Sequence, residues 1–269
     1  MTSRFVRAAL PAAVVLASVA ATLTAPASAA SKSDDVWVRF DNTKPGHSIL
    51  RLANAGKAPV TVKIVRSNGG HLVSRQVKNT RSRVADFPPY AGGSSAPHAV
   101  VAVVSRKRDR LAPRTSSFSF GVDFRIDAAA IAARDDGNNL MQRGYFGSPA
   151  QYKLQVDKGV IGCRIKGQLG SVFLTADTPV DAAKWYRIRC SLSPVVDGPD
   201  TAQLRISTLG SRGRPHLLEN HTAIVEIGRL VFPRGRPLAI GGKIKDSLLM
   251  PARVEQFNGL LDNAFFRLG

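Results

Sequence analysis

Strict alternation of apolar and polar residues is the feature that most constrains the fold of this chain. From Phe118 to Ile126 every second residue is apolar, and the residues between them are Ser119, Gly121, Asp123 and Arg125. Side chains of a β-strand point alternately to opposite faces of the sheet. The pattern therefore predicts a strand with one face in the core and the other in water.

The same alternation recurs further along the chain, with turn-forming residues between the runs. Residues 152–156 and 161–165 flank Asp157-Lys158-Gly159, and this arrangement predicts a hairpin. Another alternating run covers residues 186–192, and the only helix-like stretch, at 127–134, is short. These recurrent strands predict an all-β fold, a two-sheet antiparallel jelly-roll sandwich.

The first 29 residues have the organisation of an export signal. Arg4 and Arg7 precede an apolar stretch at 8–23, and Ala27-Ser28-Ala29 supplies the small residues that a signal peptidase needs. We predict that residues 1–29 are a cleaved signal peptide, that the protein is extracellular, and that the remainder, 30–269, is a single domain. No later segment has the roughly 18 uninterrupted apolar residues of a membrane-spanning helix, so no transmembrane segment is expected.

The two cysteines, Cys163 and Cys190, are in phase with the apolar residues of their predicted strands. Both side chains are therefore expected to face the core. A small, even number of cysteines in an exported chain favours a structural disulfide. We predict a bridge between Cys163 and Cys190; two free buried thiols are the alternative.

The charge balance is strongly positive, with a formal net charge of +19. Such a field concentrates polyanions near the surface, and arginine matches carboxylates through two parallel hydrogen bonds. The densest cluster, Arg106-Lys107-Arg108 with Arg110, lies in a predicted loop. A glycan or anionic cell-wall polymer is the expected partner, and specific recognition of nucleic acid is not expected. A basic surface without a dedicated polyanion partner is the alternative.

Several short motifs follow one another in a recognisable order along the second half of the chain. They are Phe118-Ser119-Phe120 after Pro113, Asn139-Leu140-Met141-Gln142-Arg143-Gly144, Tyr152-Lys153-Leu154 before Gly159, Lys184-Trp185-Tyr186, Leu238-Ala239-Ile240-Gly241-Gly242 and Phe257-Asn258-Gly259-Leu260-Leu261-Asp262. In this order they resemble the strands of laminin G-like domains of secreted bacterial proteins, within the concanavalin A-like lectin and glucanase superfamily. The resemblance is best over residues 115–269 and implies the same jelly roll.

The resemblance also implies that the fold is able to hold a calcium ion, because related jelly rolls often bind Ca²⁺ through Asp, Asn and backbone oxygens. Asp262 matches the closing-strand acid of the family, Asn258 lies near it, and Asp41 approaches them if the domain termini pair. A solvated turn is the alternative for these residues. The chain has Trp185-Tyr186 where the family often has a tryptophan-histidine pair, so no ligand specificity is carried over.

The fold also houses glycoside hydrolases, but the sequence lacks their catalytic pattern. Glu219, Glu226 and Glu255 are the only glutamates, and none has the Asp and second Glu that such glycosidases place along one strand. A Gly-x-Ser-x-Gly motif is absent. His216, Glu219 and His221 lack the order of a zinc-protease motif, and we interpret them as loop residues. No catalytic residue is predicted, and the protein is not expected to be an enzyme.

A monomeric, exported, non-catalytic recognition domain is the function that the sequence favours. The predicted ligand-binding residues are the aromatic pair Tyr145 and Phe146, and three arginines of a basic segment, Arg205, Arg212 and Arg214. Aromatic rings offer a flat apolar face and arginines bind carboxylates, so a glycan or acidic surface polymer is the expected ligand. The alternatives are an enzyme that acts on polysaccharide through an unrecognised site, and a structural or protein-binding module.

Overall fold

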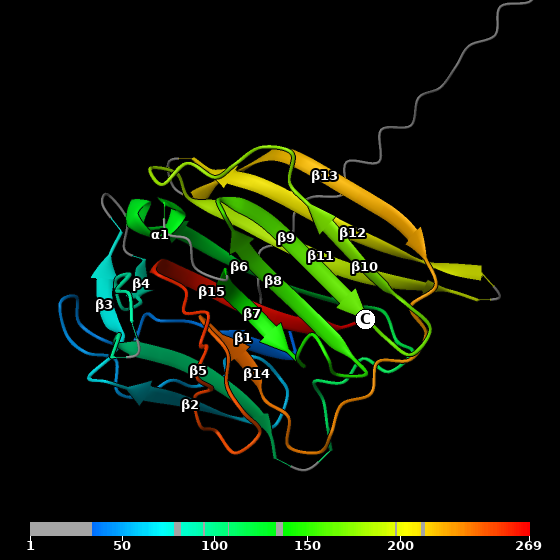
Figure 1. Cartoon of the computed structure of the whole chain (residues 1–269), viewed down its shortest axis with the longest axis horizontal. Coiled ribbons are helices and arrows are strands. Elements are labelled where there is room, and N and C mark those ends of the chain that lie inside the picture. The colour runs from blue at the N-terminus through cyan, green and yellow to red at the C-terminus, as the bar shows by residue number, and fades with distance from the viewer. Residues whose placement is uncertain are drawn as a thin grey trace, which may run out of the picture.

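The protein is a sandwich of two antiparallel β-sheets (Figure 1). This confirms the predicted all-β jelly-roll class. The computed structural model describes residues 34–77, 82–93, 95–106, 108–132, 137–196, 198–210 and 213–269. The predicted signal peptide, residues 1–29, lies outside the described residues and stays a prediction.

Sheet A contains eight strands within these ranges. In spatial order they are β13 (Pro215–Val225), β12 (Gly198–Leu209), β11 (Tyr186–Val195), β6 (Phe118–Ile126), β15 (Gly259–Leu268), β4 (Arg83–Asp86) and β3 (Val73–Gln76), with β1 (Val36–Val38) also paired to β15. β15 pairs with β4 through residues 260–261 and with β1 through residues 264–266. The two ends of the described chain therefore lie side by side in sheet A.

Sheet B contains seven strands of the described chain. Their order is β10 (Ser171–Thr175), β9 (Val160–Lys166), β8 (Gln151–Asp157), β7 (Asn138–Arg143), β14 (Leu238–Ile240), β5 (His98–Ser105) and β2 (Val60–Ser67). β8 and β9 form the hairpin that the sequence predicts. A short helix, α1 (Ala128–Ala132), follows β6 (Figure 1). In the part of the chain that is described, no helix has the length and apolar character needed to cross a membrane.

The core between the sheets is rich in aromatic side chains. The ring of Tyr152 on β8 stacks on Phe266 of β15, with centroids 5.4 Å apart, and lies 5.0 Å from Phe120 of β6. All three side chains are fully buried. The apolar positions of β6, from Phe118 to Ile126, all lie in this core, as the alternation predicts. These contacts join sheet A to sheet B.

A disulfide also joins the two sheets. Cys163 of β9 is bonded to Cys190 of β11, with the Cα atoms 6.3 Å apart. The predicted bridge is confirmed, and neither cysteine is a free thiol.

On the outer face of sheet A, some outward-pointing polar residues are buried and do not contact water. Asp123 of β6 points away from the core, yet it is only 2% exposed. Arg187 and Arg189 of β11 cover it and donate hydrogen bonds to its carboxylate at 2.7 and 3.1 Å. The expectation that this side chain faces water was wrong, because alternation gives the direction of a side chain but not what lies over it.

Candidate functional site

The outer face of sheet B carries aromatic and basic side chains in one row. The strand register pairs Arg164 of β9 with Phe173 of β10 on one side and with Lys153 of β8 on the other. Residues paired across strands point to the same face. The neighbours of Arg164 in the strand, Cys163 and Ile165, are buried in the core. The row of three therefore faces outward.

Phe146 lies on the loop that joins β7 to β8. Gly144 begins this loop with a φ of +78°, and a Cβ there would lie 2.1 Å from the carbonyl oxygen of Ala150, so the position requires glycine. The hydroxyl of Ser148 accepts a hydrogen bond from the backbone N–H of Tyr145 at 3.0 Å. This closed loop presents Phe146 with 72% of its surface exposed.

Arg164 brings the loop and the row together. Its guanidinium carbon lies 4.5 Å from the centroid of the Phe146 ring, a cation–π contact. Lys166 donates from Nζ to the carbonyl oxygen of Phe146 at 3.3 Å. Within the described ranges, the guanidinium of Arg164 makes no hydrogen bond or ion pair, and its buried Nε has no acceptor. Its Nη groups, which are not buried, therefore keep donors that no residue of the described chain uses.

A second exposed ring lies one strand away. Phe173 of β10 is 50% exposed and packs against Gly162 of β9, where a Cβ would come within 2.7 Å of the ring. The glycine leaves the space in which this ring rests on the sheet. We refer to Phe146, Arg164, Lys166 and Phe173 as the aromatic–basic surface.

Lys153 borders this surface and is paired with Glu255. Its Nζ lies 3.2 Å from Oε2 of Glu255, and Lys243 forms an ion pair with the other carboxylate oxygen. Burial lowers the pKa of Lys153 to about 8. Both oxygens of Glu255 are thus engaged by ammonium groups.

Of the two predicted aromatic ligand residues, Phe146 is exposed, whereas Tyr145 is half-buried. The hydroxyl of Tyr145 donates to the carbonyl oxygen of Ile244 at 2.5 Å, and the guanidinium of Arg236 lies 4.9 Å from the centre of its ring. Burial raises the pKa of Tyr145. Tyr145 therefore anchors the loop that carries Phe146.

Of the predicted arginines, Arg205 does not join this surface. Arg205 on β12 lies between the buried core residues Leu204 and Ile206 and is paired with Arg189, so it faces outward from sheet A, on the opposite side of the sandwich. Arg214 is exposed in the turn between β12 and β13. Arg212 lies outside the described residues. Phe146 and Arg205, which were expected to belong to one contact region, therefore lie on opposite faces of the sandwich.

Of the three predicted calcium ligands, Asp41 lies near Asp262, whereas Asn258 lies apart from both. Burial raises the pKa of Asp262 to about 7, and the negative charges of the nearby Asp123 and Asp41 act in the same direction. One oxygen of Asp262 accepts hydrogen bonds from Ser82 and Asn263 at 3.3 and 3.1 Å, and the other is buried without a hydrogen bond. Asp41 accepts a hydrogen bond from the backbone N–H of Arg83 at 3.1 Å.

Asn258 lies just before β15, too far from Asp262 along the chain to share an ion with it. Four residues of extended chain separate them by about 13 Å, whereas oxygen ligands lie about 2.5 Å from a Ca²⁺ ion. The side chain of Asn258 donates to the carbonyl oxygen of Pro88 at 2.7 Å instead. Among the described residues, Asp41, Asp262 and Asn258 therefore do not form one coordination shell.

Residues 216–221 are not a loop. His216, Glu219 and His221 lie on β13, the edge strand of sheet A, so the interpretation as loop residues was wrong. A β-bulge explains the error: Ile206 pairs with Glu219 and Ser207 with Leu217, which leaves one extra residue between them. The bulge interrupts the period-two pattern by which the other strands are recognised.

Sequence reasoning did not select Arg164, Lys166 and Phe173. Each occupies an outward position of a strand, between residues that face the core. An aromatic residue such as Phe173 in the polar phase of a strand is a signal that the sequence contains. Its proximity to Arg164 depends on strand pairing, and the contact between Arg164 and Phe146 depends on loop geometry.

No protein-family model matches the chain, and no curated protein matches its sequence. Solved structures do match its fold. A receptor binding domain has a TM-score of 0.53 at 12% identity, over 88% of this chain and 47% of that one. The binding domain of Botulinum neurotoxin DC, solved in complex with rat synaptotagmin II, has a TM-score of 0.51 at 11% identity, over 87% and 48%. The chain spans about half the length of these two structures, and likeness at such identity shows the fold alone.

A laminin G structure matches the fold with a lower TM-score than these two binding domains. The LG1-3 region of the laminin alpha2 chain has a TM-score of 0.44 at 13% identity, over 78% of this chain and 31% of that one. A score of this size carries no argument. The chain is thus an all-β sandwich, and its membership of the laminin G-like family stays a prediction.

Proposed function

We propose that the chain is an exported, non-catalytic recognition module that binds an acidic glycan through the aromatic–basic surface of sheet B. One observation carries the proposal. Two exposed phenylalanine rings lie beside Arg164, whose guanidinium makes no hydrogen bond within the described chain.

The chemistry of the surface matches a sugar that bears a carboxylate or sulfate. An exposed ring offers an apolar face to the C–H groups of a pyranose, and the fork of a guanidinium donates two hydrogen bonds to a carboxylate. Lys166 adds a cation two residues from Arg164 on the same side of the strand. A neutral glycan would use the rings but leave both cations without an anionic partner.

The charge of the whole chain supports an anionic ligand. The net charge of +19, which becomes +17 once Arg4 and Arg7 are removed with the predicted signal peptide, raises the local concentration of polyanions and speeds their encounter with the surface. Because this field is screened by salt, it does not by itself give a site. The aromatic rings supply the contacts that salt leaves intact.

Three further observations support export and a binding role. The inter-sheet disulfide is typical of proteins that fold in an oxidising compartment. The first 29 residues have the pattern of an export signal. Two solved structures of similar fold are binding domains, one of them solved with a protein partner.

The test is a binding panel of uronic-acid, sulfated and neutral polysaccharides with the purified protein. We expect retention on the acidic polymers, and Arg164→Lys to weaken it about 10-fold, because lysine keeps the charge but loses the fork. Arg205→Lys on the opposite face is the matched control and is expected to bind normally. Equal loss in both variants, or a preference for neutral polymers, would overturn the proposal.

A further inference from the structure

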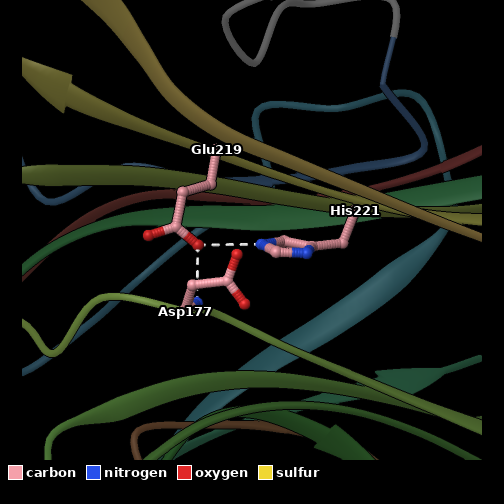
Figure 2. Close-up of side chains that lie close together, drawn as sticks. All are labelled: Asp177, Glu219 and His221. Carbon is pink, nitrogen blue, oxygen red and sulfur yellow. Dashed lines mark hydrogen bonds and ion pairs between the residues drawn. The ribbon is translucent and has the colours of Figure 1, made fainter.

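A cluster of metal-ligating side chains lies between the edge strands of the two sheets, apart from the proposed glycan surface. Figure 2 shows Asp177, Glu219 and His221 turned toward one another. Nε2 of His221 lies 2.8 Å from Oε2 of Glu219. One ligand atom from each of the three residues lies within 4.8 Å of the other two.

Glu219 and His221 occupy core-facing positions of β13. The register pairs them with Ile206 and Leu204 of β12, which are buried in the core. Further along the same face of β13, Ala223 packs against the core. Positions that are apolar elsewhere are therefore filled here by a carboxylate and an imidazole.

Asp177 comes from the other sheet. It lies just after β10, the edge strand of sheet B, whereas β13 is the edge strand of sheet A. Its backbone N–H donates to Oε2 of Glu219 at 2.8 Å, and that of Thr178 donates to Oε1 at 3.1 Å. The cluster thus joins the two sheets at one edge of the sandwich.

The hydrogen bonds to Glu219 account for only part of this arrangement. They leave the carboxylate of Asp177 without a hydrogen bond in the described chain, although it lies beside the carboxylate of Glu219. Two neighbouring carboxylates repel each other, and a cation that both of them bind offsets this repulsion. A bound cation would remove this repulsion and use the free oxygens of Asp177.

We propose that Asp177, Glu219 and His221 bind a divalent transition-metal ion of the zinc, cobalt or nickel class. Ligand bonds of about 2.1 Å place neighbouring ligand atoms about 3.0 to 3.4 Å apart around such an ion. The ligand atoms, which all lie within 4.8 Å of one another, are therefore within about 2 Å of the spacing that an ion requires. One imidazole with two carboxylates suits zinc-like ions, whereas calcium and magnesium prefer oxygen ligands alone. Water completes the shell on the exposed side of Asp177, and the ion cross-links sheet A to sheet B.

The test is calorimetric titration of untagged, chelator-treated protein with ZnCl₂, supported by the visible absorption of added Co²⁺. Asp177→Asn is the main variant, because Asp177 is exposed and its side chain makes no hydrogen bond in the described chain, so the fold is retained. His221→Ala tests the imidazole. His216→Ala, at an exposed position of the same strand, is the matched control.

We expect one Zn²⁺ per chain, at least 10-fold weaker binding in Asp177→Asn and His221→Ala, and unchanged binding in His216→Ala. Zn²⁺ should also raise the melting temperature of the wild type but not of Asp177→Asn. The proposal is overturned if Asp177→Asn binds Zn²⁺ as the wild type does, if His216→Ala loses as much affinity, or if Ca²⁺ binds more tightly than Zn²⁺.

Discussion

At the scale of single residues, buried charges on the outer face of sheet A make stability depend on exact pairing. Asp123 accepts two hydrogen bonds from Arg187 and one from Arg189, and all three side chains are largely buried. Removing one partner of a buried pair leaves a charge without compensation, which costs about 3–5 kcal/mol. We expect Asp123→Ala to lower the free energy of unfolding by this amount in urea denaturation.

An exposed ion pair is the control for this prediction. Arg75 and Asp86 lie 2.8 Å apart at the surface, and such pairs contribute about 1 kcal/mol or less. Arg75→Ala should therefore change the unfolding free energy little. Similar losses in Asp123→Ala and Arg75→Ala would contradict the assignment of Asp123 as the centre of a buried network.

Asp262 makes stability depend on pH. Burial raises its pKa from 3.8 to about 7, so between these values the folded protein holds a proton that the unfolded chain releases. The contribution of this group to stability is fully present below the lower value. It falls as the pH rises toward the upper one, by at most about 1.4 kcal/mol per pH unit. Asp262→Asn, which never ionises, should flatten this decline in unfolding curves measured from acid to neutral pH. If the unfolding free energy of the variant declined with pH as that of the wild type does, another group would be responsible for the decline.

The two exposed rings should matter for binding and not for folding. Phe146 and Phe173 leave much of their surface in water, so Phe146→Ala and Phe173→Ala are expected to change the unfolding free energy by about 0.5 kcal/mol or less. Each ring should contribute about 0.5–1.5 kcal/mol to glycan binding, a loss of roughly 2- to 10-fold in affinity. Titration of an acidic oligosaccharide measures this, with Tyr90→Ala, an exposed aromatic residue of another loop, as the control. Normal binding by both phenylalanine variants would exclude the rings from the site.

At the scale of elements, the disulfide between β9 and β11 is the covalent link of the two sheets. Its cysteines are 27 residues apart in sequence. Closing a loop of this length stabilises a protein by about 3 kcal/mol through the entropy of the unfolded chain. The double variant Cys163→Ala/Cys190→Ala should lose this amount and remain folded, because the aromatic core also joins the sheets. A loss below about 1 kcal/mol in urea denaturation would show that the core alone determines the stability.

The strands that alternation predicts are those that pair regularly. β6, β8 and β9 each have core residues at every second position, so their location and their buried faces could be predicted from sequence. β13 could not, because its bulge shifts the pattern and its core-facing positions near Asp177 are polar.

Sites formed by several elements were harder to predict from the sequence than the strands. Phe146 was predicted as a ligand residue from its place on a loop, and the structure shows it exposed. Arg205 was grouped with Phe146 because it belongs to a segment rich in arginine, but sheet order places Arg205 on the opposite face. Which outward residues meet depends on strand order and register, which a single sequence does not specify.

At the scale of the whole molecule, the large positive net charge and a specific site make different contributions to binding. The field acts at long range and is screened at high ionic strength, where the Debye length falls to a few ångströms. Stacking on Phe146 and Phe173 and the hydrogen bonds of Arg164 act at contact distance and persist. The two contributions are separable by salt.

The most direct test of the glycan site is the affinity of one uronic-acid polysaccharide, measured at about 0.15 M and about 0.5 M salt, for the wild type and for Phe146→Ala/Phe173→Ala. We predict that the wild type retains measurable affinity at the higher salt and that the double variant, which has the same charge, binds only at the lower salt. Equal salt curves for the two proteins would show that the positive field alone binds the polymer, and would contradict a recognition site on sheet B.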